Sequence, residues 1–313
     1  MLAGPVTGAP LPGASASLHD PVIDFHQHLW PLELVEELEA RISAPFLRGE
    51  MLTTAEGAFR VSLEANELGR RLDDLDRAGI DVAVISLQPT LGIDGLHPAE
   101  RASLVDAYHH GIASLVAESG GRLRALSAGQ AAEGFDGACV GASRLLDPRG
   151  LAEVLDSLEE CGGTLFVHPD RIQPPPAGAP HWWQAVTEYT AEMQAAFFAW
   201  VEHGATRWPE VRVVFSLLAG GAPFQLGRLQ SRGVDVHRFT SAPVFLETSS
   251  YGRLSIELAL AAFGIERVVF GSDFPVIDPD VTLNAIRSLG ETGFATVSSR
   301  NAVGLLGKQA VAT

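Results

Sequence analysis

Short apolar runs recur along the chain, and most are separated by segments long enough to hold a helix. The runs are rich in Val, Ile, Leu and Ala, a composition typical of buried strands. They fall at residues 22–27, 82–87, 123–128, 138–142, 164–168, 211–217, 243–248 and 267–272. Eight strands with intervening helices predict a parallel β/α barrel rather than an open sheet.

The segments between the runs carry apolar residues at helical spacing. Residues 151–158 place Leu and Val at intervals of three and four, and Gly162 and Gly163 then provide a stop. A long helical region is expected at 181–203, where Trp and Phe side chains must pack in the core or rim the mouth of the barrel. Neither an internal repeat nor a linker follows residue 21, so residues 21–313 are expected to form one domain.

The first 20 residues are rich in Ala, Gly, Pro and Ser and contain no Lys or Arg. A secretory signal needs a basic start and an unbroken apolar stretch, so a flexible N-terminal arm is expected here instead. Cys139 and Cys161 are the only cysteines, too few for a disulfide framework. A reducing cytoplasm is therefore the expected compartment.

The negative charge of the chain argues against anionic binding partners. Of 313 residues, 46% are hydrophobic and 19% are charged, and the formal net charge is −16. Without a basic cluster, nucleic acid and anionic membrane surfaces are disfavoured as partners, and no apolar run approaches the roughly 18 residues of a spanning helix. A small-molecule substrate is expected, and a homodimer or a heteromeric assembly is left open.

Four side chains that commonly bind metal ions stand where predicted strands end. His26 and His28 stand at the end of the first run, His168 closes the fifth, and Asp273 directly follows the eighth. The carboxyl ends of barrel strands converge on one face of the molecule, so these residues are expected to meet. Three imidazoles and one carboxylate suit Zn²⁺ or a similar divalent ion, and Mn, Fe or Co are the alternatives to Zn.

The stretches around these residues carry a family resemblance. VIDFHQHLWP, TLFVHPD, ERVVFGSDFP and NAVGLLG resemble the amidohydrolase superfamily, in the branch of metal-dependent decarboxylases and hydrolases that holds aminocarboxymuconate-semialdehyde decarboxylase. The resemblance implies a distorted (β/α)8 barrel with a metal at His26, His28, His168 and Asp273. It also implies a metal-bound water and an acid/base role for Asp273.

Lysine usage separates subgroups of that superfamily. Many of its two-metal members bridge the ions with a carbamylated lysine, but Lys308 near the C-terminus is the only lysine here. No predicted strand can supply a carbamate or a Schiff-base amine. One divalent ion is the simplest expectation, and a second ion held by carboxylates such as Asp24 or Glu247 is the alternative.

One position departs from the family pattern. The family places a histidine at the end of strand six, before a Gly-rich turn and a proline, and Leu217 stands there. His181 and Trp182, after a Pro-rich loop, are candidates to hang over the mouth in its place, although a solvated helix start is the plainer interpretation of His181. Arg48 lies in the loop region where the family's decarboxylases carry a carboxylate-binding arginine, and an ordinary surface role is its alternative.

Two further carboxylates accompany the strands. Glu247 stands near the end of the seventh strand, where it would either hydrogen-bond a ligand histidine or balance an arginine. Asp24 shares the parity of His26 and His28, so it would either orient His26 or belong to a polar layer inside the barrel.

These features favour a metal-dependent hydrolase acting on a small carbonyl- or carboxylate-bearing molecule. The metal would activate a water, and Asp273 would take the proton of that water. Decarboxylation is the second interpretation, favoured by the branch of the family and disfavoured by Leu217. A catalytically weak metal-binding subunit of a larger enzyme is the third.

Overall fold

The structure is a computed structural model that describes residues 20–171 and 173–306. The arm expected at residues 1–20 lies outside the described residues except for Asp20, and so does Lys308. Within the described part of the chain, no helix is both long and apolar enough to cross a membrane.

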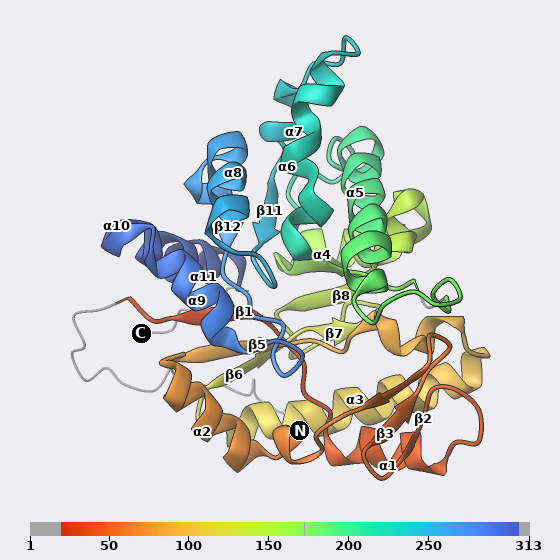
Figure 1. The fold of residues 1–313 in the computed structure, drawn as a ribbon. Coiled ribbons are helices and arrows are strands. Elements are labelled where there is room, and N and C mark those ends of the chain that lie inside the picture. Colours follow the sequence, from red (N-terminus) through yellow and green to blue (C-terminus); the bar gives the residue numbers. More distant parts are fainter. Residues whose placement is uncertain (1–19, 172, 307–313) are drawn as a thin grey trace, which may run out of the picture.

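Every apolar run forms strand, and the strands of the barrel pair in parallel (Figure 1). One sheet has the order β1 (Ile23–Gln27), β5 (Val82–Ile85) and β6 (Leu123–Ala125). The other holds β7 (Ser127–Ala128), β8 (Gly137–Gly141), β9 (Thr164–His168), β10 (Arg212–Phe215), β11 (Val244–Glu247) and β12 (Val268–Val269). The run predicted as one strand at 123–128 is therefore divided between the two sheets.

Backbone hydrogen bonds cross both seams between the sheets. Leu126 N donates to Ile85 O at 2.8 Å on one side, and Phe25 N donates to Phe270 O at 2.9 Å on the other. The first strand thus lies beside the segment that follows the last one, as in the distorted (β/α)8 barrel that the family resemblance implies.

Helices cover the strands on opposite sides (Figure 1). On one side lie α1 (Leu32–Ala40), α2 (Leu68–Ala78) and α3 (Pro98–Glu118), and on the other lie α5 (Tyr189–Ala199), α6 (Ser216–Gln230), α7 (His237–Thr240) and α8 (Arg253–Phe263). The remaining helices are α4 (Ala152–Cys161), α9 (Pro279–Arg287), α10 (Gly290–Ala295) and α11 (Asn301–Leu305). π-helical turns at Gln184–Glu188 and Trp200–Gly204 extend α5 at both ends, close to the predicted bounds of 181–203.

Two apolar layers hold this architecture together. Inside the barrel, Phe25, Val84, Phe166 and Val214 pack together in one buried cluster, which Leu305 of α11 also joins. A larger cluster fills the space between the strands and the helices. The barrel interior is therefore a packed core, and only the carboxyl ends of its strands are free to form a site.

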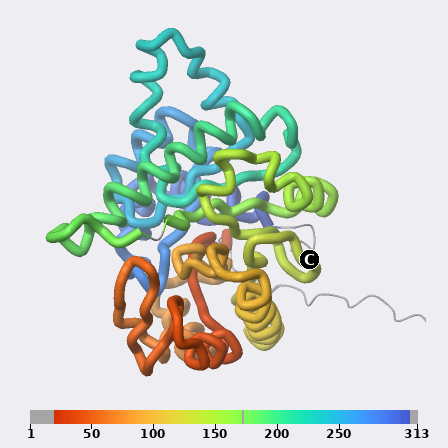
Figure 2. The backbone as a smooth tube through the Cα atoms, turned by 90° about the vertical axis from the view of Figure 1, so that its right-hand side faces the viewer, coloured from red at the N-terminus to blue at the C-terminus, as the bar shows by residue number. Residues whose placement is uncertain are grey.

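The segment between α1 and α2 contains a small sheet that the sequence did not predict. Antiparallel strands β2 (Phe46–Arg48), β3 (Met51–Thr53) and β4 (Ala58–Arg60) pair in order, and β2 packs beside α1. In Figure 2 the tip of the hairpin formed by β3 and β4, drawn in orange, lies beside the green segment that leads into α5. The hairpin thereby forms one wall over the carboxyl ends of the strands.

The end of β10 has an unusual backbone. Residues 217–221 all have positive φ, from 48° at Leu218 to 79° at Gly221, before α6 continues with ordinary helical geometry. The left-handed conformation costs roughly 1–2 kcal/mol for each residue other than glycine. Strain of this kind is commonly found at functional sites.

Candidate metal centre

The four predicted ligands converge at the carboxyl ends of the strands. One ligand atom from each of His26, His28, His168 and Asp273 can be chosen so that all four lie within 4.8 Å of one another. His26 Nε2 lies 3.2 Å from His28 Nε2, and His28 Nε2 lies 3.1 Å from Asp273 Oδ1. A positive φ of 67° at Asp273 turns its carboxylate toward the histidines.

Each histidine is held by a hydrogen bond on its other ring nitrogen. His26 Nδ1 contacts Glu247 Oε2 at 3.0 Å, and His28 Nδ1 contacts the backbone oxygen of Ser86 at 2.9 Å. His168 Nδ1 contacts the backbone oxygen of Pro169 at 2.8 Å. Because Nδ1 donates to oxygen in every case, each Nε2 keeps its lone pair for a ligand bond. The residues present therefore fit one divalent cation.

The electrostatics of the cluster also suit a cation. Burial, with His26 and His28 close by, holds the pKa of His168 well below its ordinary value. Burial opposes ionisation of Asp273, but the neighbouring histidines lower its pKa overall. Burial likewise opposes a charge on His26, yet the carboxylates of Glu247 and Asp273 raise its pKa. A neutral imidazole and an ionised carboxylate are the forms that bind metals, and these are the forms favoured at His168 and Asp273. The two carboxylates that raise the pKa of His26 attract a metal cation in the same way that they attract a proton.

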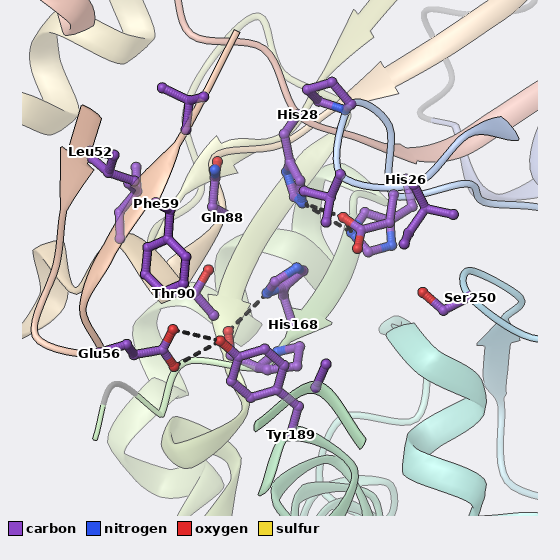
Figure 3. A pocket seen from close by; sticks show the side chains of 18 of the residues that line it. His26, His28, Leu52, Glu56, Phe59, Gln88, Thr90, His168, Tyr189 and Ser250 are labelled. Carbon is purple, nitrogen blue, oxygen red and sulfur yellow. Dashed lines mark hydrogen bonds and ion pairs between the residues drawn. The ribbon is translucent and has the colours of Figure 1, made fainter. Parts of the chain in front are cut away.

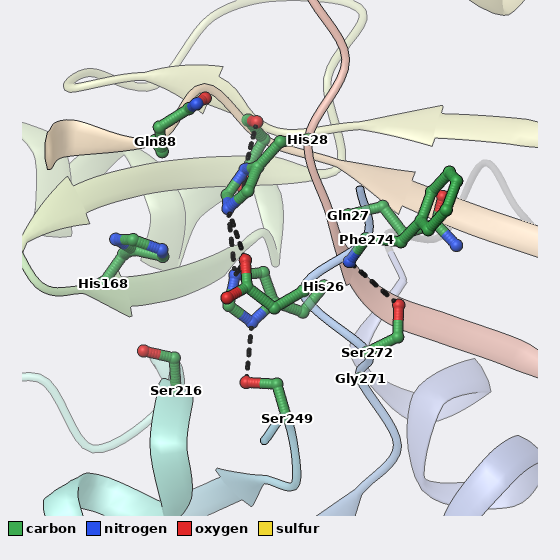
Figure 4. Close-up of polar contacts among 12 residues, drawn as sticks. His26, Gln27, His28, Gln88, His168, Ser216, Ser249, Gly271, Ser272 and Phe274 are labelled. Carbon is green, nitrogen blue, oxygen red and sulfur yellow. Dashed lines mark hydrogen bonds and ion pairs between the residues drawn. The ribbon is translucent and has the colours of Figure 1, made fainter. Parts of the chain in front are cut away.

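Glu247 is fully buried and contacts a predicted ligand directly. Its Oε2 accepts from Ser249 Oγ at 2.8 Å and from the backbone N of Leu217 at 3.3 Å, in addition to the contact with His26. This geometry matches the first of the two roles weighed from the sequence, a hydrogen bond to a ligand histidine. Figure 4 shows that Ser249 also contacts Nδ1 of His26.

Asp24 is equally buried but does not contact the imidazole of His26. Its carboxylate accepts from the backbone N of His26 at 3.1 Å, from Gln27 Nε2 at 2.8 Å and from the backbone N of Ser272 at 2.9 Å. A register irregularity in β1 between Asp24 and Gln27 breaks the alternation on which the parity argument relied. Burial raises the pKa of Asp24 to about 6.

Sequence reasoning missed the arginine behind this network. Arg71 of α2 is fully buried and donates to Gln27 Oε1 at 3.0 Å and to the backbone oxygen of His28 at 2.8 Å. Its guanidinium also lies 4.8 Å from the centre of the Phe274 ring. It thereby joins the strand that carries two ligands to the segment that carries the fourth. The helical periodicity of α2 gave no signal for this role.

A cavity of about 760 Å³ opens directly above the cluster. All four predicted ligands line it, together with aromatic and apolar side chains from several elements (Figure 3). Prominent among these are Trp30, Leu52, Phe59, Tyr189, Leu217 and Tyr251. The site can therefore hold a small, largely flat molecule against the metal ligands.

The structure separates the other sequence candidates. Leu217 lines the cavity, as its place in the family pattern implies. His181 and Trp182 are exposed and are not among the described lining residues, so they do not take the place of the missing histidine. Arg48 lies outside the cavity as well. It belongs to β2, and its guanidinium donates hydrogen bonds to the backbone oxygens of Glu39, Leu47 and Arg41.

Comparison with known proteins identifies the family. Residues 23–292 match the Amidohydrolase family. A curated relative, the 2-amino-3-carboxymuconate-6-semialdehyde decarboxylase of Dictyostelium discoideum, is 21% identical over 277 residues, which cover 76% of this chain and 76% of the relative.

Two solved structures share the fold. IDCase of Metarhizium anisopliae in its apo form has a TM-score of 0.78 and 20% identity, covering 91% of this chain and 96% of that one. The 5-carboxyvanillate decarboxylase of Novosphingobium aromaticivorans, complexed with manganese and 4-hydroxy-3-methoxy-5-nitrobenzoic acid, has a TM-score of 0.70 and 16% identity, covering 95% and 98%. The resemblance inferred from the strand-end motifs is confirmed. The chain is an enzyme whose reaction the family match leaves open, and it belongs to the amidohydrolase family.

Proposed function

We propose that this protein is a metal-dependent, non-oxidative decarboxylase of a small, flat carboxylic acid. The observation that carries the proposal is the position of the ligand cluster at the base of a cavity with mainly apolar and aromatic walls. A planar unsaturated acid fits between such walls with its carboxylate directed at the cluster.

One divalent ion would be held by His26, His28, His168 and Asp273, with His26 oriented by Glu247. The donor set favours zinc, and manganese is the ion named in the solved relative from Novosphingobium aromaticivorans. When bound, such an ion supplies a Lewis acid for substrate oxygens.

The reaction requires neither water nor an oxidant. The bond between the carboxylate carbon and the substrate carbon breaks, its electron pair stays on the substrate carbon, and CO₂ leaves. A proton must then reach that carbon. Asp273 lies 3.1 Å from His28 at the edge of the cavity and can hold such a proton between its uptake and its delivery.

Decarboxylation replaces the hydrolysis favoured by the sequence for two reasons. One curated relative and one solved structure with a bound metal are both decarboxylases. In addition, Leu217, which the sequence analysis counted against decarboxylation, weighs more heavily against hydrolysis, because it presents a hydrocarbon to the cavity where hydrolysis would need a donor for a developing oxyanion. Loss of a carboxylate as neutral CO₂ makes no such demand at that position.

The proposal is tested with the protein loaded with Mn²⁺ or Zn²⁺ and a panel of carboxyl-¹³C-labelled benzoates and unsaturated acids. A decarboxylase releases ¹³CO₂ and, in D₂O, places one deuterium on the carbon that lost it. Esters and lactones of the same acids form the second arm. Cleavage of those compounds without CO₂ release would establish the hydrolase instead, and inertness in both arms would point to a weak metal-binding subunit.

The substitution Asp273→Asn examines the proton carrier in the same assay. The amide keeps the shape of the side chain and an oxygen for the metal, but it cannot hold the proton. CO₂ release is expected to fall by about 10²–10⁴ while metal content stays near one ion per chain. If activity stays close to wild type with metal bound, the proton comes from another group.

A further inference from the structure

A polar pair lines the cavity in addition to the predicted metal ligands. Tyr189, the first residue of α5, donates its hydroxyl to Glu56 in the turn between β3 and β4, with distances of 2.7 Å to Oε1 and 2.9 Å to Oε2. Both side chains line the cavity, and Figure 3 shows the Tyr189 hydroxyl turned toward the Glu56 carboxylate. Residues 133 positions apart in the sequence thus meet at the wall formed by the hairpin.

The pair presents acceptors rather than donors to the cavity. Burial raises the pKa of Tyr189, and the adjacent carboxylate of Glu56 raises it further. The phenol therefore stays protonated and donates its hydrogen bond to Glu56. A carboxylate has about four acceptor positions and Tyr189 supplies a single proton, so acceptor capacity remains. The phenolic oxygen of Tyr189 can accept a further hydrogen bond as well.

No cation neutralises Glu56 among the described residues. Arg60 is the one arginine or lysine among the described lining residues, and it pairs with Glu50 at 2.8 Å with its side chain 79% exposed. Burial raises the pKa of Glu56, which reflects the cost of a charge in this half-buried position. A ligand that donates N–H or O–H to Glu56 would offset that cost, whereas a second carboxylate would be repelled.

We propose that Glu56 and Tyr189 form a specificity site that selects monocarboxylic acids carrying an N–H or O–H donor at the end away from the metal. The inference rests on the proposed function for one point only, that the substrate carboxylate lies at the ligand cluster. The aromatic walls between the two ends then favour a planar spacer such as a substituted benzene ring.

Calorimetric binding to the metal-loaded, full-length protein tests the proposal. The probes are benzoate, 3- and 4-aminobenzoate, and benzene-1,3- and 1,4-dicarboxylate. One of the two aminobenzoates is expected to bind about tenfold or more tightly than benzoate, since hydrogen bonds to a charged acceptor are strong. Both dicarboxylates are expected to bind more weakly than benzoate.

The variant Glu56→Gln keeps the size of the side chain and an acceptor for Tyr189, but it removes the charge. It is expected to lose the preference for the amine and to accept the dicarboxylates. Glu188→Gln is the matched control, because Glu188 adjoins Tyr189 and acts on Glu56 only through its charge. That control should keep the wild-type preference.

The proposal would be overturned if the wild type bound all five acids with equal affinity or bound none of them. A preference that survives in Glu56→Gln would overturn it as well. Calorimetry measures binding and not turnover. CO₂ release without a Glu56-dependent preference therefore contradicts only the specificity site, and a preference without CO₂ release contradicts only the decarboxylase.

Discussion

At the scale of single residues, Leu217 is the most informative side chain in the site. The sequence marks it as a departure from the family pattern. The structure places it in the wall of the cavity, where it also packs against the core between the strands and the helices. Its backbone has a φ of 54° and donates to Glu247, which in turn holds His26. Histidine occupies the left-handed region more readily than leucine does. The backbone therefore suits the residue that the family has there.

The substitution Leu217→His tests that interpretation. The imidazole would add an acid/base group to the cavity, so the pH dependence or the substrate range of the enzyme is expected to change, with rates shifting by about tenfold or more. A buried imidazole without a partner would cost roughly 1–3 kcal/mol in the free energy of unfolding. Steady-state kinetics across pH and a urea titration measure the two effects.

Leu217→Met serves as the control for that substitution, because it keeps an apolar wall. It should leave both the pH profile and the substrate range as they are. An unchanged profile in Leu217→His, with the protein folded and metal bound, would mean that residue 217 does not reach the reacting groups.

At the scale of elements, the sequence located every barrel strand, because continuous apolar runs are a strong signal. It also placed the ligands at strand ends, since topology alone brings those ends together. It missed the sheet of β2, β3 and β4, whose strands of three residues are too short to show a period. The pair of Glu56 and Tyr189 depends on that sheet. No local motif could have revealed the pair.

The left-handed turn at 217–221 gives a prediction at the same scale. A Cβ on Gly220 would lie 2.0 Å from the backbone oxygen of Thr190, whereas one on Gly221 would meet nothing nearer than 3.9 Å. Both glycines have positive φ. Gly221→Ala should therefore cost about 1–2 kcal/mol from backbone strain alone, and Gly220→Ala should cost about 1–3 kcal/mol more because α5 must move.

Urea denaturation of the two glycine variants measures this difference. Gly220→Ala should also weaken binding of aminobenzoate, since Thr190 adjoins Tyr189. Equal stability of the two variants would show that α5 yields to the extra methyl group without strain.

At the scale of the whole molecule, the predicted ligands join distant parts of the chain. His26 and His28 come from the first strand, His168 from β9, and Asp273 from the segment after β12, which also bonds to the first strand. A bound ion would thus link the seam between β1 and the segment after β12 to β9, a strand in the middle of the larger sheet. The formal net charge of −16 adds a general attraction for cations. Metal binding should therefore stabilise the folded chain as a unit.

Removal of the metal is expected to lower the melting temperature of this protein. At a hundredfold excess over its dissociation constant, a ligand of the folded state contributes about 2.7 kcal/mol, which for a chain of 313 residues corresponds to a shift of about 4 °C. Thermal unfolding with EDTA, and then with added Zn²⁺ or Mn²⁺, measures the shift, and elemental analysis should find about one ion per chain.

The double variant His26→Ala/His28→Ala should lose both the shift and the ion. His237→Ala, which removes an exposed histidine of α7, should keep both. Equal metal content and equal shifts in the two variants would place the metal elsewhere, because only the first removes imidazoles from the cluster.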